Sequence, residues 1–172
     1  MTILEERRAT TPEALAFFDG LDPVDLDFMT GRWKGAEIRT GHPLDGWLEA
    51  SGWFGKEFID PETVHPLLFR GANGDIFKVA PSPQAMRWAQ RFTFFRNPSW
   101  SPLLRLGTSL MHSETSQARL RMVEMRGRVS ATMIYDHLPI LDAFRRIDAR
   151  TVLGLMDEKG QPQPYVFLLE RC

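Results

Sequence analysis

The sequence is short of cysteine and of long apolar runs. Cys172 is its single cysteine, so an intramolecular disulfide cannot form and a thiolate metal site is close to excluded. The N-terminal segment MTILEERRATT holds no apolar run of signal-peptide length, and no later segment approaches the ~18 consecutive apolar residues of a membrane-spanning helix. We therefore expect a cytoplasmic protein without a transmembrane segment and without a bound metal.

Clustered positive charge is also scarce, although charge is uneven along the chain. The net charge is -1, with acids in excess in the first half and bases in excess in the second. Basic residues concentrate in one stretch, interrupted by Glu114 and Glu124. They are Arg87, Arg91, Arg96, Arg105, Arg119, Arg121, Arg126 and Arg128. This pattern is typical either of a solvated surface or of peripheral contact with anionic lipid, and it does not indicate a nucleic-acid partner.

The first half of the chain predicts short helices and several strands. Proline and an acid in the first turn predict a helix from Thr11 to about Gly20. Strand structure is expected from Gly31, is interrupted by a short helix near residues 44–51, and resumes in WFGKEFI. The segments VHPLLFR and DIFKVA predict a hairpin.

The residues after Gln117 predict a β-meander. Five strand-length segments follow one another, separated by short turn sequences: ARLRMVEM, RVSATMIY, LDAFRRI, TVLGLMD and YVFLLER. Successive strands at short spacing pair antiparallel. With the strands of the first half, the total is about 8–10, which is enough to close a small barrel. The expected fold is mainly β, a lipocalin-like antiparallel barrel in a single domain of residues 1–172.

The middle of the chain has a different character. Ser82-Pro83 and Ser101-Pro102 are typical of helix starts, and each precedes apolar residues at helical spacing. Residues 82–112 are therefore predicted to be a helical pair that serves as a lid, a portal or a plug at one end of the barrel. This insertion, residues 81–116, separates an N-terminal segment, 12–80, from the meander, 117–172.

Two glycines flank a tryptophan in Gly31-Arg32-Trp33-Lys34-Gly35. A phosphate-binding loop needs a following helix N-terminus or a lysine followed by Ser or Thr, but here a strand is expected. We predict a structural role instead. Trp33 closes the barrel floor, while Gly31 and Gly35 let neighbouring backbone approach its indole.

This motif resembles the signature of the GXWXG protein family, in which the namesake domain precedes a companion C-terminal domain of unknown function. Longer strings carry the resemblance further: TGHPLDGWLEASGWFGKEF, VHPLLF, RMVEMRGRVSATMIYDHLPILDAFRRID and TVLGLMD. The resemblance implies a cytosolic bacterial protein. The likeness of the G-x-W opening to lipocalin and nitrobindin barrels implies a hydrophobic cavity, although a shared fold does not fix a function.

The leading hypothesis is a container for a small hydrophobic ligand, such as a lipid, a fatty-acid-like molecule or an aromatic metabolite. The predicted wall residues are Trp53, Phe69, Met133, Tyr135 and Phe144. The predicted polar anchors are His42, Asp45, His65 and Asp142. Alternation along the strand places Asp142 inward, where Arg146 or a tyrosine hydroxyl would satisfy it.

Other hypotheses remain open at this stage. One hypothesis is that the protein is an enzyme: a hydrolase, isomerase or cyclase. It would use His42 with Asp45, or Tyr135 with Asp142, as general acid and base. Alternatively these side chains only bind backbone groups of their own turns. The nitrobindin likeness also implies non-covalent haem on His112 or His137, and without it no cofactor is expected. A further hypothesis is a scaffold that binds another protein through its basic helices.

Overall fold

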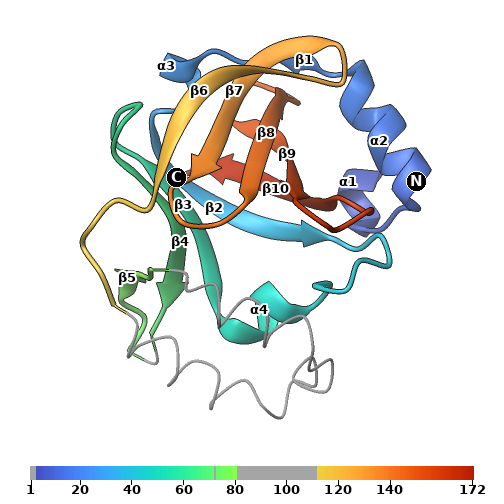
Figure 1. Ribbon diagram of the computed structural model, residues 1–172. Helices are drawn as coiled ribbons and strands as arrows, with labels where there is room; N and C mark the ends of the chain where they lie inside the picture. The colour runs from blue at the N-terminus through green and yellow to red at the C-terminus, as the bar shows by residue number, and fades with distance from the viewer. Residues whose placement is uncertain (1–2, 72, 81–111) are drawn as a thin grey trace.

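A closed antiparallel β-barrel of eight strands forms the body of the protein (Figure 1). The computed structural model describes residues 3–71, 73–80 and 112–172. Its strands are β1 (Asp22–Pro23), β2 (Gly31–Ile38), β3 (Trp53–Phe58), β4 (Val64–Arg70), β5 (Ile76–Lys78), β6 (Ala118–Met125), β7 (Arg128–Tyr135), β8 (Ile140–Arg146), β9 (Thr151–Glu158) and β10 (Tyr165–Arg171).

The barrel runs in the order β8-β7-β6-β4-β3-β2-β10-β9, and β9 pairs back onto β8. β1 adds to β8 and β5 adds to β4, both antiparallel. The predictions of a mainly-β antiparallel barrel, of a β4–β5 hairpin and of a five-strand meander, here β6 to β10, are confirmed. Full closure leaves no open edge in the cylinder that another chain could extend.

In the described residues, four short helices lie outside the barrel wall: α1 (Ile3–Glu6), α2 (Thr11–Gly20), α3 (Leu26–Met29) and α4 (Trp47–Ser51). The predicted start of α2 is confirmed by a capping box. The Thr10 hydroxyl accepts from the Glu13 amide, and the Glu13 carboxylate accepts from the Thr10 amide at 2.7 Å. Apart from His112, the predicted helical pair 82–112 lies outside the described residues.

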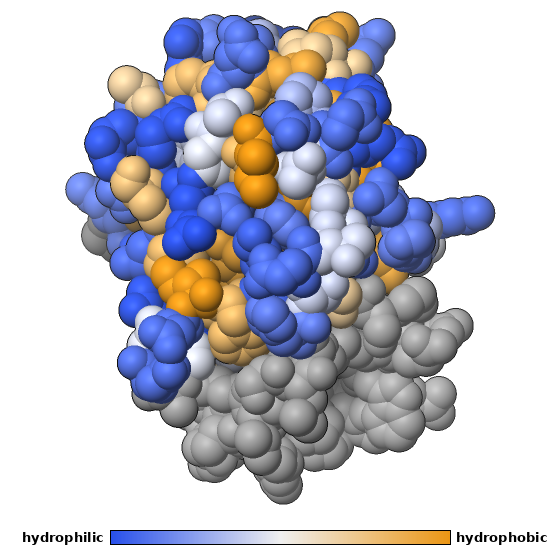
Figure 2. Space-filling model, turned by 90° about the vertical axis from the view of Figure 1, so that its left-hand side faces the viewer, coloured by the Kyte–Doolittle hydropathy of each residue, from blue (hydrophilic) through white to orange (hydrophobic). Residues whose placement is uncertain are grey.

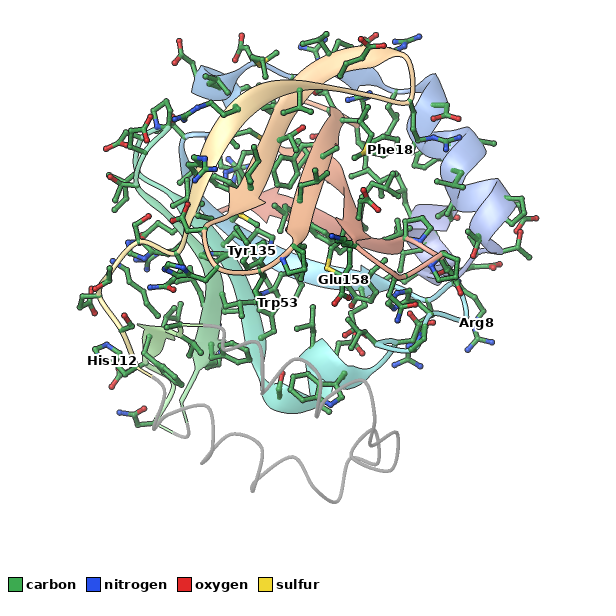
Figure 3. The ribbon with its side chains drawn as sticks, in the orientation of Figure 1. Arg8, Phe18, Trp53, His112, Tyr135 and Glu158 are labelled. Carbon is green, nitrogen blue, oxygen red and sulfur yellow. The ribbon has the colours of Figure 1, made fainter. Side chains whose placement is uncertain are left out.

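Apolar side chains fill two separate cores. Inside the barrel, Phe144 meets Phe58 and Phe167 edge to face, with ring centroids 5.6 and 6.3 Å apart. Outside, α2 covers one flank of the barrel with Phe18, which packs into a buried cluster with Val166 and its neighbours (Figures 1 and 3). The outer core explains why successive residues of β8, β9 and β10 are buried on both faces.

One junction of the cylinder, between β4 and β6, is much shorter than the others. Its strand register consists of the single pair Val64 and Ala118, whereas β6 and β7 pair along their full length from Ala118 to Met125. Ser116 supplements this junction because its hydroxyl accepts from the Val64 amide at 3.0 Å. We call the place where β4 meets β6 the seam.

The face shown in Figure 2 carries mostly hydrophilic side chains, with small and separate hydrophobic patches. Among the described helices, none has the length and apolar character needed to cross a membrane.

Candidate functional site

The floor of the barrel is built around Trp33. Its side chain is fully buried, and its indole Nε1 donates to the Met29 carbonyl of α3 at 2.7 Å. The Arg171 guanidinium lies over the indole, 4.3 Å from the ring centroid, and donates to the carbonyls of Thr30, at 2.6 Å, and Phe28. Strands β2 and β10 therefore meet at this tryptophan, and its polar atom is satisfied.

The second glycine of the motif makes room for a different tryptophan from the one expected. A Cβ on Gly35 would lie 2.2 Å from the Trp53 ring, so only glycine leaves space for that indole. The close backbone approach to Trp33 occurs instead at Gly55, whose added Cβ would lie 1.9 Å from the Trp33 carbonyl oxygen. The expectation that Gly35 serves the Trp33 indole is thus corrected: it seats Trp53, which lines the cavity described next.

A cavity opens at the other end of the barrel, next to α4. The space open to the centre of a water-sized molecule is about 60 Å³. The segment around α4 contributes Leu44, Trp47 and Leu48. The strands and the loop before β8 contribute Trp53, Lys56, Leu67, Phe69, Tyr135, Leu138, Asp142, Met156, Tyr165 and Phe167. In Figure 3, Trp53 and Tyr135 both lie inside the barrel, whereas His112 lies well apart from them.

A buried ion pair is the main polar feature of this cavity. Lys56 Nζ lies 2.9 Å from Asp142 Oδ2, and the two side chains are 4% and 1% exposed. Lys56 also donates to the Pro66 carbonyl at 3.2 Å, and its ammonium lies 5.1 Å from the Phe167 ring centroid. Neither oxygen of Asp142 has a hydrogen-bond partner within the described part of the chain, and Oδ2 meets the Lys56 ammonium as an ion pair, so the carboxylate is only half satisfied.

Burial shifts the protonation equilibria of this cluster. Loss of hydration raises the pKa of Asp142 above its ordinary value, although the Lys56 charge opposes the shift. Burial, followed by the Asp142 charge, raises the pKa of Tyr135 well above its ordinary value. Tyr135 is therefore a neutral hydroxyl near pH 7, and Asp142 is a stronger proton acceptor than a carboxylate in water.

A second buried carboxylate, Glu37, holds the wall segment α4 in place. Its carboxylate accepts from the amides of Gly46 at 2.6 Å and Glu49 at 3.1 Å, which lie at the N-terminal end of α4. Loss of hydration raises the pKa of Glu37, and its charge in turn raises the pKa of Tyr165, after the larger effect of burial. Glu37 thus connects the C-terminal end of β2 to the segment that holds Trp47, which lines the cavity.

His42 and Asp45 are both bound to backbone of their own turn. Asp45 Oδ2 accepts from three consecutive amides, those of Thr40, Gly41 and His42, at 2.8–3.1 Å. His42 Nδ1 accepts from the Leu44 amide at 3.0 Å, which requires that this nitrogen carry no proton. Neither residue is among those lining the cavity. Their geometry matches the structural alternative rather than an acid–base pair directed at a ligand.

Three other predicted site residues also lie away from the cavity lining. Met133 and Phe144 are fully buried core residues. His65 pairs in register with Glu57, outside the lining residues, and burial followed by the nearby Lys78 charge lowers its pKa. Of the predicted wall and anchors, the structure brings Trp53, Phe69, Tyr135 and Asp142 together around the cavity.

The described residues do not fit haem ligation through the predicted histidines. His112 and His137 are both exposed, and neither lines the cavity. His112 Nε2 pairs instead with Glu114 at 3.0 Å. Within the described ranges, no group of three or more His, Cys, Asp or Glu side chains is arranged to bind a metal ion.

The arginines predicted to form a basic patch are paired with acids where the structure describes them. The pairs are Arg119 with Asp136 at 2.8 Å, Arg121 with Glu62 at 2.6 Å, Arg126 with Asp19 at 2.6 Å and Arg128 with Asp22 at 4.0 Å. Arg87, Arg91, Arg96 and Arg105 lie outside the described residues. Contact with an anionic membrane stays a prediction.

Lys56 lines the cavity but was not among the residues predicted from the sequence. Lys56 lies two residues before the buried Phe58, and side chains two apart in a strand point to the same face. This alternation could have indicated that Lys56 points inward. A lysine in a strand is usually assigned to the solvent face, and the pairing of β3 with β4 shifts register on both sides of Gly55.

Comparison with known proteins finds two family matches and a similar solved structure. The sequence model described as "GXWXG protein" matches residues 16–74, and the one described as "Domain of unknown function (DUF4334)" matches residues 116–171. A crystal structure of a protein from Thermomonospora curvata is 34% identical, with a TM-score of 0.73. The match covers 99% of this chain and 93% of that one. No functionally curated protein matches.

Proposed function

The chain belongs to the GXWXG protein family, whose description states no activity, and from its cavity we propose that it binds a small hydrophobic ligand carrying one polar group. The observation that carries this proposal is an apolar cavity with a half-satisfied ion pair, Lys56 with Asp142, in its wall. Such a combination of apolar lining and a few convergent polar groups is typical of ligand sites in barrels.

The size of the cavity limits the part of the ligand that it encloses. One water needs roughly 10–15 Å³ of space open to its centre. The cavity, with about 60 Å³, therefore admits roughly four to six groups of the size of a water or a CH₂. At about 0.8 kcal/mol for each buried CH₂, apolar burial contributes about 3–5 kcal/mol. This corresponds to a dissociation constant around the millimolar range, so tighter binding requires a ligand that extends beyond the cavity.

The unpaired polar atoms define what the ligand's polar group does. The buried polar atoms of the lining residues that have no hydrogen-bond partner in the described part of the chain include Asp142 Oδ1 and Trp53 Nε1. One accepts and the other donates, so a hydroxyl or carbonyl group suits this wall. Each buried polar atom left unpaired costs about 1–3 kcal/mol, and a ligand that satisfies one recovers part of that cost.

The test is binding of benzyl alcohol, a ring with one hydroxyl, measured by ligand-observed NMR. Its eight non-hydrogen atoms exceed what the cavity encloses, so part of the molecule extends beyond it. Leu138→Trp fills the cavity from its wall, and Val129→Trp places the same side chain at a site that is 51% exposed. We expect the first variant to weaken binding at least about tenfold and the second to leave it unchanged, because only the first removes enclosed volume. Equal binding by both variants, or no binding by the wild type, would contradict the proposal.

A further inference from the structure

The chain contains four lysines, Lys34, Lys56, Lys78 and Lys159, and they lie in very different surroundings. Lys34 and Lys159 are exposed, and Lys78 is partly exposed and bound to Glu57 and Glu114. Lys56 alone lines the cavity, and it is 3% exposed. An amine so placed meets only molecules that enter the apolar cavity.

We propose that Lys56 is a carbonyl-reactive lysine whose amine forms a reversible Schiff base with a small hydrophobic aldehyde or ketone held in the cavity, with Asp142 as the proton carrier. This inference rests on the proposed ligand-binding function and assigns the ligand class. Lysines that form Schiff bases are characteristically desolvated in apolar pockets, as this one is.

The geometry supplies what the nucleophile needs. A lysine amine in water has a pKa of about 10.4, so only about one in 2,500 is neutral near pH 7. Asp142 Oδ2 lies 2.9 Å from Lys56 Nζ, a distance short enough for proton transfer, and neither oxygen of this carboxylate has a hydrogen-bond partner among the described residues. Asp142 can therefore take the ammonium proton and hold it beside the reacting atoms.

The reaction balances without any further reagent. Asp142 accepts a proton from the Lys56 ammonium, and the nitrogen lone pair attacks the carbonyl carbon as the C=O π pair moves to oxygen. Proton transfer through Asp142 gives a neutral carbinolamine. Asp142 then donates its proton to the hydroxyl group, which leaves as water while the C=N bond forms. The products are a protonated imine on Lys56, an ionised Asp142 and one water molecule.

The charge of the cavity wall is unchanged by this reaction, which favours the product. The protonated imine keeps one positive charge next to Asp142, so the buried ion pair persists. The rings of Trp53, Tyr135 and Phe167 lie with centroids 5.1–5.8 Å from Nζ and face the same cation. Lys56 and Asp142 are the charged groups among the described lining residues, so an anionic group on the substrate would find no further cation there.

The experiment uses benzaldehyde with cyanoborohydride, which reduces an imine to a stable benzylamine, followed by peptide mapping of all four lysines. We expect Lys56 to be labelled at least about tenfold faster than Lys34 or Lys159, because the others lack a proton acceptor inside a binding cavity. Benzyl alcohol, which binds without reacting, should protect Lys56 alone. Labelling of Lys56 no faster than of the exposed lysines, or without protection by benzyl alcohol, overturns the inference.

Two variants isolate the roles of the pair. Lys56→Arg keeps the charge and removes the nucleophile, so it should abolish the label in this peptide. Asp142→Asn should slow labelling of Lys56 by about tenfold or more, in line with the usual effect of removing a general base. Unchanged or faster labelling would overturn the role of Asp142. The wild-type map remains decisive if either variant fails to fold.

The outcomes separate this inference from the proposed function. If benzyl alcohol binds but Lys56 is not labelled preferentially, the protein is a container and the Schiff-base chemistry is refuted. If benzyl alcohol does not bind and Lys56 is not labelled, both proposals fail.

Discussion

Replacing Gly35 by alanine should destabilise the protein through a tryptophan that lies on another strand. The added Cβ would lie 2.2, 2.3 and 2.7 Å from three atoms of the Trp53 ring, whereas ordinary contacts lie at 3.4–4 Å. The ring must therefore move by more than about 1 Å, since the backbone of β2 is held by both β3 and β10.

The expected cost follows from overpacking of a filled core, which is about 1–3 kcal/mol. For a domain of this size, each kcal/mol lowers the melting temperature by about 2–4 °C. Because Trp53 lines the cavity, its displacement should also weaken binding of benzyl alcohol. Stability and binding should thus fall together, although Gly35 itself is not among the lining residues.

Urea unfolding followed by circular dichroism measures the first effect, and Gly20→Ala provides the matched control. An added Cβ at Gly20 meets no atom within 4 Å, so this variant should be neutral or up to about 1 kcal/mol more stable. Trp53→Phe, combined with Gly35→Ala, should cost less than the sum of the two single changes, because the smaller ring relieves the contact.

Two results would refute this reasoning. The first is a Gly35→Ala protein as stable as Gly20→Ala. The second is additivity of Gly35→Ala with Trp53→Phe, which would show that Trp53 is not the group that excludes the methyl.

Two further predictions concern the floor and the wall segment. Arg171→Met removes the cation above Trp33 and two donated hydrogen bonds, and should lower the urea-derived stability by about 2–4 kcal/mol. Arg32→Met, which breaks an exposed ion pair, should cost no more than about 1 kcal/mol, and equal losses would contradict the assigned role of Arg171. Because folding raises the pKa of Glu37, its contribution to stability is greatest below about pH 4.5 and falls as the pH rises through the folded-state value. Wild type should therefore lose stability relative to Glu37→Gln as the pH rises above about 4.5 in urea titrations, and a constant difference would exclude this titration.

The strands after Gln117 were predictable because they need only alternation and turn chemistry. The same alternation placed Asp142 inward correctly, as its 1% exposure shows. It did not identify the partner. Arg146 has the right parity but lies at the end of β8, where it is exposed and pairs with Asp22 at 3.6 Å. The actual partner, Lys56, comes from a strand far away in sequence, and this kind of long-range pairing leaves no local pattern.

The cavity was less predictable, because an irregular strand builds part of its wall. Trp53 and Lys56 are three residues apart and both line the cavity, which a regular strand does not allow. The register shifts around Gly55 permit it. His42 and Asp45 are three residues apart in the sequence, and this spacing indicated a functional pair. A tight turn whose side chains bind its own backbone uses the same residues at the same spacing.

The seam between β4 and β6 gives the cylinder a preferred line of opening. Along the rest of the wall, parting two strands means breaking a ladder of several residue pairs, whereas at the seam it means releasing one residue pair, the Ser116 hydroxyl, and the contacts of Leu120 and Arg121 with the loop before β4. β4 contributes Leu67 and Phe69 to the cavity, so outward movement there would widen it from the side. Amide hydrogens of β4 should accordingly exchange with deuterium sooner than those of β7. The difference between the two rates reports how much less free energy it takes to open the barrel at the seam than elsewhere.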